Sequence, residues 1–213
     1  MGESKTEKLN KLFTEWKSNY KSNTDGFAED GIINEELWNE AKLKVLFLLK
    51  ETVGFSGDFR EYSNNGPWIE LGYMNYYIQN TNEVNIPDFR YISADECHKS
   101  YRMCSVVNLK KISGKSTSSY EEIYQFGMKD KILIEEEISI IKPEIIVCGG
   151  TFDIFSNLFE LNNIEISHRV YKSSKFNEAL IIDSVHPSQR TRRELVYYTL
   201  GACYQNALKS LLK

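Results

Sequence analysis

The chain has 213 residues, of which 41% are hydrophobic and 26% are charged, and its formal net charge is -4. This balance suits one soluble domain with an ample core and gives no general attraction to nucleic acid, although a local basic patch stays possible. No apolar stretch approaches membrane-spanning length, and residues 1–20 form a charged amphipathic segment rather than a signal peptide. We therefore expect a cytoplasmic protein that does not enter a membrane.

Residues 1–41 are predicted to form an N-terminal helical extension, packed on the rest of a single domain that covers 1–213. Ser4 and Glu7 have the spacing of a capping box, which opens an amphipathic helix to about residue 20. A polar loop over 23–31 and a short helix over 34–41 complete the extension. Its role is open, and it is interpreted as a cover for one face of a sheet.

Short apolar runs without alternation predict strands that are buried on both faces. They cover 44–49, 103–107, 145–148 and 180–182. Helical patterns separate them and close the chain, while 64–67 is predicted as a turn, 81–93 as irregular and 164–171 as one outer strand. The last helix is predicted to begin at a capping box over 191–194. This alternation predicts a three-layer α/β/α sandwich with a mostly parallel central sheet of about four to five strands.

Polar groups follow each of the four buried strands. They are Lys50-Glu51, Asn108, Gly149-Gly150-Thr151 and His186-Pro187-Ser188. Because parallel strands joined by right-handed crossovers end on one edge of a sheet, we expect these groups to meet there. Taken singly, each is explained as well by a solvated charge, a turn residue or a tight strand-to-helix turn. Their convergence favours a functional site.

Aromatic and basic residues lie near these strand ends. Phe55 and Phe59 belong to a glycine-containing loop after the first strand, which we interpret as one wall of the site. Two basic clusters follow the second and fourth strands and comprise Lys110, Lys111, Lys115, Arg190, Arg192 and Arg193. Arginines at the start of a helix oppose its dipole, and a phosphate backbone would relieve that conflict. A solvated loop and a surface helix start explain the clusters equally well.

The four cysteines lack the paired spacing of a metal or iron–sulfur site. We interpret them as reduced, buried thiols that act as small apolar residues. The sequence therefore predicts neither a metal nor a cofactor.

Four blocks in order resemble the uracil-DNA glycosylase superfamily, in particular an uncharacterised bacterial branch of it. They are VLFLLKET (45–52), CSVVNLKK (104–111), IKPEIIVCGG (141–150) and VHPS (185–188). The resemblance implies that Glu51 activates water, Asn108 reads the base and His186 stabilises the departing base. It also implies that Phe55 or Phe59 stacks on an extruded base. A shift of one position would place Lys50 at the acidic position.

The chain departs from the superfamily pattern in three places. Leu49 stands where the first motif usually has glycine, Thr52 stands where it has proline, and a polar, basic stretch replaces the hydrophobic wedge after His-Pro-Ser. The resemblance implies a DNA N-glycosylase that removes uracil or another deaminated or modified base. The alternative that these departures favour is a catalytically silent protein of this fold that binds nucleic acid or a partner protein.

The residue types suit base excision. Breaking an N-glycosidic bond leaves positive charge on the sugar and negative charge on the base, so a carboxylate and an imidazole N–H stabilise the two products. An asparagine amide offers one donor and one acceptor to a uracil-like edge. We expect a monofunctional, monomeric enzyme that acts on single-stranded or mismatched DNA, with substrate contacts that include Lys50, Gly149, Gly150, Thr151 and Ser188. An unrelated α/β hydrolase ranks last because no G-x-S-x-G occurs.

Overall fold

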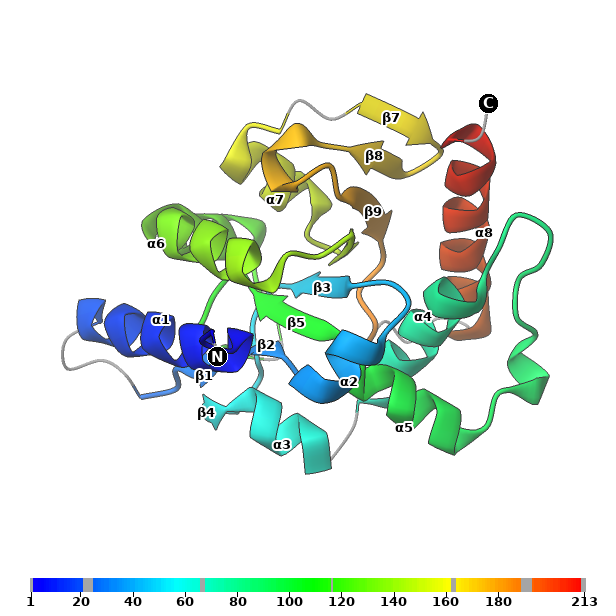
Figure 1. Cartoon of the computed structure of the whole chain (residues 1–213). Coiled ribbons are helices and arrows are strands. Elements are labelled where there is room, and N and C mark those ends of the chain that lie inside the picture. Colours follow the sequence, from blue (N-terminus) through cyan, green and yellow to red (C-terminus); the bar gives the residue numbers. More distant parts are fainter. Residues whose placement is uncertain are drawn as a thin grey trace.

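The computed structural model describes residues 2–20, 25–65, 68–115, 117–161, 164–188 and 193–211. A seven-stranded sheet forms the centre of this part of the chain, in the order β2-β5-β3-β6-β9-β8-β7 (Figure 1). The four central strands run parallel to one another, and they are β5 (Ser105–Asn108), β3 (Val45–Leu49), β6 (Ile145–Gly149) and β9 (Leu180–Ser184). The predicted α/β class with a mostly parallel centre is therefore confirmed.

Antiparallel strands close both edges of the sheet. They are β2 (Gly31–Ile32) beside β5 at one edge, and β8 (Val170–Lys172) with β7 (Ile164–Ser167) at the other. A separate parallel pair joins β1 (Ala28–Glu29) to β4 (Gly57–Asp58). The expected number of four to five strands was too low. Two-residue strands are too short to show a period in the sequence, and 164–171, predicted as one strand, forms part of a hairpin of two strands. Arg169, at φ 62°, lies in the turn of that hairpin.

Strand β3 shows why an unbroken apolar run marks the centre of the sheet. All five of its residues are buried, and successive side chains enter opposite cores. Leu46 and Leu48 belong to one apolar cluster, whereas Val45, Phe47 and Leu49 belong to the other. Both faces of the strand are thus covered by helices, as in other parallel sheets.

Each face of the sheet has its own layer of helices (Figure 1). The first layer contains α1 (Lys5–Asn19), α6 (Tyr120–Ile141) and α7 (Phe152–Phe159). The second contains α4 (Ile69–Asn80), α5 (Ala94–Arg102) and α8 (Arg193–Leu211). Shorter elements complete the described chain, namely α2 (Glu35–Glu40), α3 (Phe59–Asn65) and the 3-10 turns Phe89–Tyr91 and Ser174–Phe176. Within the described ranges, no helix is long and apolar enough to cross a membrane.

The capping signals were good guides to helix starts. The Ser4–Glu7 box forms at the start of α1 with both of its hydrogen bonds. The same pattern at Ser93 and Glu96 opens α5, a helix that sequence reasoning overlooked. The predicted loop over 23–31 is wrong over its described part, because β1 and β2 lie there and β2 joins the main sheet. Part of the predicted turn at 64–67 and the first two residues of the predicted cap at 191–194 lie outside the described residues.

Candidate functional site

A cleft of about 990 Å³ opens at the edge where the parallel strands end. Lys50 and Glu51 follow β3, Asn108 ends β5, and His186 lies two residues beyond β9. These four residues come from three parallel strands and line the same cleft, as the convergence argument predicted. The complete lining is Leu49, Lys50, Glu51, Thr52, Val53, Gly54, Phe55, Phe59, Tyr62, Trp68, Asn108, Lys115, Thr117, Ser118, His186 and Ser188.

His186 is held in one tautomer by the backbone. Its Nδ1 accepts a hydrogen bond from the Ser188 N–H at 3.2 Å, so in the neutral ring the proton lies on Nε2. Burial, together with the positive charge of Lys50, lowers the pKa of His186 below its ordinary value of 6.5. The imidazole is therefore a neutral N–H donor near pH 7, the form that stabilises a developing anion without itself gaining a charge.

Aromatic side chains form a wall of the cleft. Phe55 lies against Phe59 and Tyr62, with ring centroids 5.6 and 5.0 Å apart, and Tyr62 is 60% exposed. The ring of Trp68 lies 6.0 Å from that of His186. Flat apolar rings beside a polar floor suit a planar, partly polar ligand such as a nucleobase. Sequence reasoning found the two phenylalanines but missed Tyr62, three residues beyond Phe59 in α3, and Trp68, the N-cap residue of α4.

The Glu51 carboxylate lies at the floor of the cleft and is only 1% exposed. Its Oε2 accepts a hydrogen bond from Lys110 Nζ at 2.5 Å, and Lys110 also donates to Glu122 at 2.6 Å. Oε1 is buried and has no hydrogen-bond partner among the described residues. Gly114 covers the carboxylate so closely that a Cβ at this position would lie 1.8 Å from Oε2. Glu51 is thus a buried, half-satisfied carboxylate rather than a solvated loop charge.

Asn108 is also buried, at 2% exposure, and lines the cleft. Its Nδ2 donates to Asp30 Oδ2 at 2.9 Å, and its backbone N–H donates to the same oxygen at 2.8 Å. Asp30 was not identified from the sequence, because 23–31 was predicted to be a polar loop and Asp30 stands beside a second acidic residue, Glu29.

The basic residues of the first cluster differ in burial and in ion pairing. Lys111 was expected to meet phosphate, but it is fully buried in ion pairs with Asp30 and Glu137, so that expectation is corrected. Lys110 is equally unsuited to phosphate, because its side chain is 5% exposed and paired with two carboxylates. Lys115 is exposed and lines the cleft.

Of the second basic cluster, the described part of the chain includes Arg193 alone. Its side chain is 64% exposed and forms an ion pair with Glu70 at 3.1 Å. Arg190 and Arg192 lie outside the described residues.

The turn after β6 supports the site from outside the cleft lining. A Cβ on Gly149 would lie 2.7 Å from Leu49 Cδ2, so any larger residue here would have to displace the Leu49 side chain. Gly150 adopts φ +69°, a conformation that favours glycine. The Thr151 hydroxyl donates to the Leu48 carbonyl at 2.7 Å. These three residues, which were expected to bind substrate, are not part of the cleft lining, and their contacts hold the strand ends together.

No group of three or more histidine, cysteine, aspartate or glutamate side chains within the described ranges could hold a metal ion. All four cysteines are buried and free. A scan against protein-family models finds no match, and neither does a search of curated proteins.

Proposed function

We propose that the chain is a DNA N-glycosylase of the uracil-DNA glycosylase type, which removes uracil or another deaminated or modified base. The observation that carries this proposal is His186, a half-buried imidazole whose Nε2–H has no acceptor among the described residues and which lines a cleft that also contains Asn108 and an aromatic wall. A planar base with carbonyl groups fits each of these partners, whereas a purely structural cleft needs none of them.

In the proposed reaction an extruded base enters the cleft beside Phe55 and Trp68, because the glycosidic bond is out of reach inside a stack. The bond between C1′ and the base nitrogen breaks, and its electron pair leaves with the base. The Nε2–H of His186 stabilises the charge that collects on a carbonyl oxygen of that base. Water forms the new bond to C1′ and loses one proton. We assign Glu51 as the acceptor of that proton.

The buried environment of Glu51 suits electrostatic stabilisation of the cationic sugar. A carboxylate with one unpartnered oxygen in a nearly dry site interacts more strongly with a nearby charge than it would in water. We assign contact with the phosphate backbone to Lys115, an exposed cation that lines the same cleft.

A glycosylase assay tests this proposal. Labelled oligonucleotides containing uracil, hypoxanthine, xanthine or 5-substituted pyrimidines are offered in single-stranded and mismatched form, and alkali reveals abasic sites. We expect His186→Ala to slow cleavage at least about 100-fold, as loss of a charge-stabilising donor does, and Glu51→Gln to slow it similarly.

Two matched variants serve as controls. His168→Ala makes the same change at an exposed histidine. Glu122→Gln removes the second carboxylate partner of Lys110, and the Glu122 side chain is 44% exposed. Both should cleave at the rate of the unaltered chain. Cleavage that survives both His186→Ala and Glu51→Gln would refute the assigned site.

One observation favours a second candidate, a catalytically silent nucleic-acid-binding protein. The Glu51 carboxylate is paired with Lys110, and its side chain is only 1% exposed, so little of its surface is open to an attacking water. Under this alternative, the same assay gives salt-sensitive oligonucleotide binding without release of any base.

A further inference from the structure

Asp30 is a buried carboxylate just before β2, and none of its side chain is exposed. Its Oδ2 accepts from both the backbone N–H and the side-chain Nδ2 of Asn108. Its Oδ1 is paired with the Nζ of Lys111. Three donors therefore surround this carboxylate: two N–H groups of Asn108 and the ammonium of Lys111.

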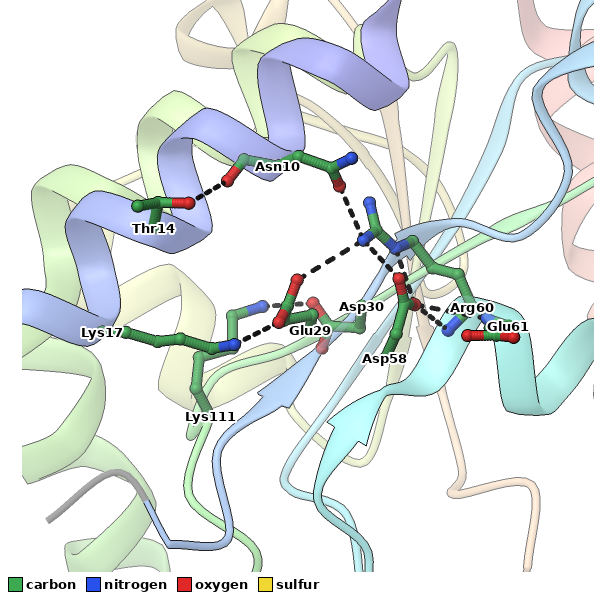
Figure 2. Close-up of polar contacts among 9 residues, drawn as sticks. All are labelled: Asn10, Thr14, Lys17, Glu29, Asp30, Asp58, Arg60, Glu61 and Lys111. Carbon is green, nitrogen blue, oxygen red and sulfur yellow. Dashed lines mark hydrogen bonds and ion pairs between the residues drawn. The ribbon is translucent and has the colours of Figure 1, made fainter.

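Asp30 itself is held in place from behind. Lys111 pairs also with Glu137 Oε2 at 2.7 Å, and its ammonium lies 5.0 Å from the centre of the Trp16 ring. Figure 2 shows the contact between Lys111 and Asp30, next to but separate from the contact of Lys17 with Glu29. A buried ionic group of this kind needs good geometry to offset its desolvation, so its members have little freedom to move.

We propose that Asp30 is a positioning residue that locks the Asn108 carboxamide in one of its two orientations, so that the cleft accepts a uracil-like edge and rejects a cytosine-like edge. This inference rests on the proposed function of the cleft. The contacts of Asp30 fix the orientation of the Asn108 amide, and the hydrogen-bond patterns of uracil and cytosine then determine which base it matches.

The lock follows from the chemistry of the amide. Asn108 can turn either its Nδ2 or its Oδ1 toward Asp30, but a carboxylate oxygen only accepts hydrogen bonds. Rotating the amide by half a turn would replace a donor facing Asp30 with a second acceptor. Hydrogen bonds to charged groups are strong enough to favour the observed orientation about 10- to 100-fold.

The two pyrimidines need opposite orientations. Uracil presents a carbonyl acceptor at position 4 and an N–H donor at position 3, whereas cytosine presents an amino donor and an unprotonated ring nitrogen. An amide that matches one edge therefore opposes the other at both atoms. If the orientation of Asn108 is fixed by Asp30, discrimination between the bases is fixed with it.

Asp30→Asn is the informative substitution because it keeps the shape and removes the acceptor-only character. Lys111 then draws the new amide oxygen, which turns an N–H₂ group toward Asn108 and favours the reversed amide. Glu137→Gln is the matched control, since it alters the other carboxylate partner of Lys111 and leaves the contacts between Asp30 and Asn108 intact.

Binding of 1-methyluracil and 1-methylcytosine is followed by the fluorescence of Trp68, the one tryptophan in the cleft lining of the described chain. We expect the original chain and Glu137→Gln to bind 1-methyluracil more tightly than 1-methylcytosine. In Asp30→Asn the ratio of the two affinities should fall at least about tenfold. A folded Asp30→Asn that keeps the preference would overturn the role of Asp30 while leaving the proposed function standing. An equal loss in Glu137→Gln would also overturn it, because the network would then act only as a scaffold.

A second measurement needs neither ligand nor variant stability. The side-chain ¹H–¹⁵N pair of Asn108, assigned by its absence in Asn108→Asp, should exchange slowly with solvent in the unaltered chain, because one of its protons is held by Asp30 in a buried site. Rapid exchange of these protons would refute the lock. A locked amide in a chain that binds neither base would instead refute the proposed function, and with it the selectivity drawn from it.

Discussion

Lys111→Met is the substitution that most directly tests the buried ionic network behind the cleft. Lys111 is fully buried, and its ammonium contacts side-chain oxygens of both Asp30 and Glu137. Methionine fills a similar volume but carries no charge. The Asp30 carboxylate would then be left with hydrogen bonds from Asn108 and with no cation to balance it.

Removing one partner of a buried ion pair destabilises a protein by about 3–5 kcal/mol, because a buried charge is left uncompensated. For a urea dependence of about 2 kcal/mol per molar, this loss lowers the unfolding midpoint by about 1.5–2.5 M. Trp16, whose ring lies 5.0 Å from the Lys111 ammonium, gives a fluorescence signal at the altered site.

Glu137→Gln should have a much smaller effect on the same network. Burial, followed by the neighbouring charge of Asp30, raises the pKa of Glu137 well above 4.5, although Lys111 acts in the opposite direction. At pH values between 4.5 and the folded pKa, Glu137 is therefore protonated in the folded chain and ionised in the unfolded chain. The free energy of unfolding falls as pH rises through this range. Glutamine should remove that slope, which reaches about 1.4 kcal/mol per pH unit, and should raise stability relative to the original chain as pH increases.

The measurement is a urea titration of the three proteins, repeated across pH. A midpoint for Lys111→Met within about 0.5 M of the original would refute the reasoning, since that is less than half the smallest expected shift. A Glu137→Gln variant whose stability has the same pH slope as the original chain would show that Glu137 is ionised in the fold.

Three further predictions concern the cleft. Lys50→Met should raise the pKa of His186 toward its ordinary value of 6.5, because it removes a neighbouring positive charge. The resonances of the ring protons follow this pKa during a pH titration, and an unchanged titration midpoint would contradict the assigned charge effect. Trp68→Ala should weaken base binding about 5- to 150-fold, measured by calorimetry, if stacking contributes about 1–3 kcal/mol; undiminished affinity would exclude stacking on this ring. Gly114→Ala should displace the Glu51 carboxylate and destabilise the fold by about 1–3 kcal/mol in thermal unfolding, and an unshifted transition would argue against the close contact.

Much of the fold and part of the site could be predicted from sequence because both depend on local patterns. Buried apolar runs such as 45–49 identify central strands, and the residues that follow them must share an edge. For that reason Glu51, Asn108 and His186 were correctly placed together in one cleft.

The remainder depends on contacts between distant segments, which local patterns do not encode. Asp30 meets Lys111 across 81 positions of sequence, so neither residue signals the other. Lys111 was assigned to phosphate because it belongs to the basic cluster after the second strand, and only the arrangement of α1 and α6 shows that it is buried. The two-residue strand β2, which follows Asp30, is likewise too short to show a period.

Single-turnover release of labelled uracil from a single-stranded oligonucleotide is the most direct test of the proposed function. The account predicts release by the original chain, release at least about 100-fold slower for His186→Ala, and an unchanged rate for His168→Ala. Equal rates for all three proteins, or no release by any of them under conditions where the oligonucleotide is bound, would contradict it.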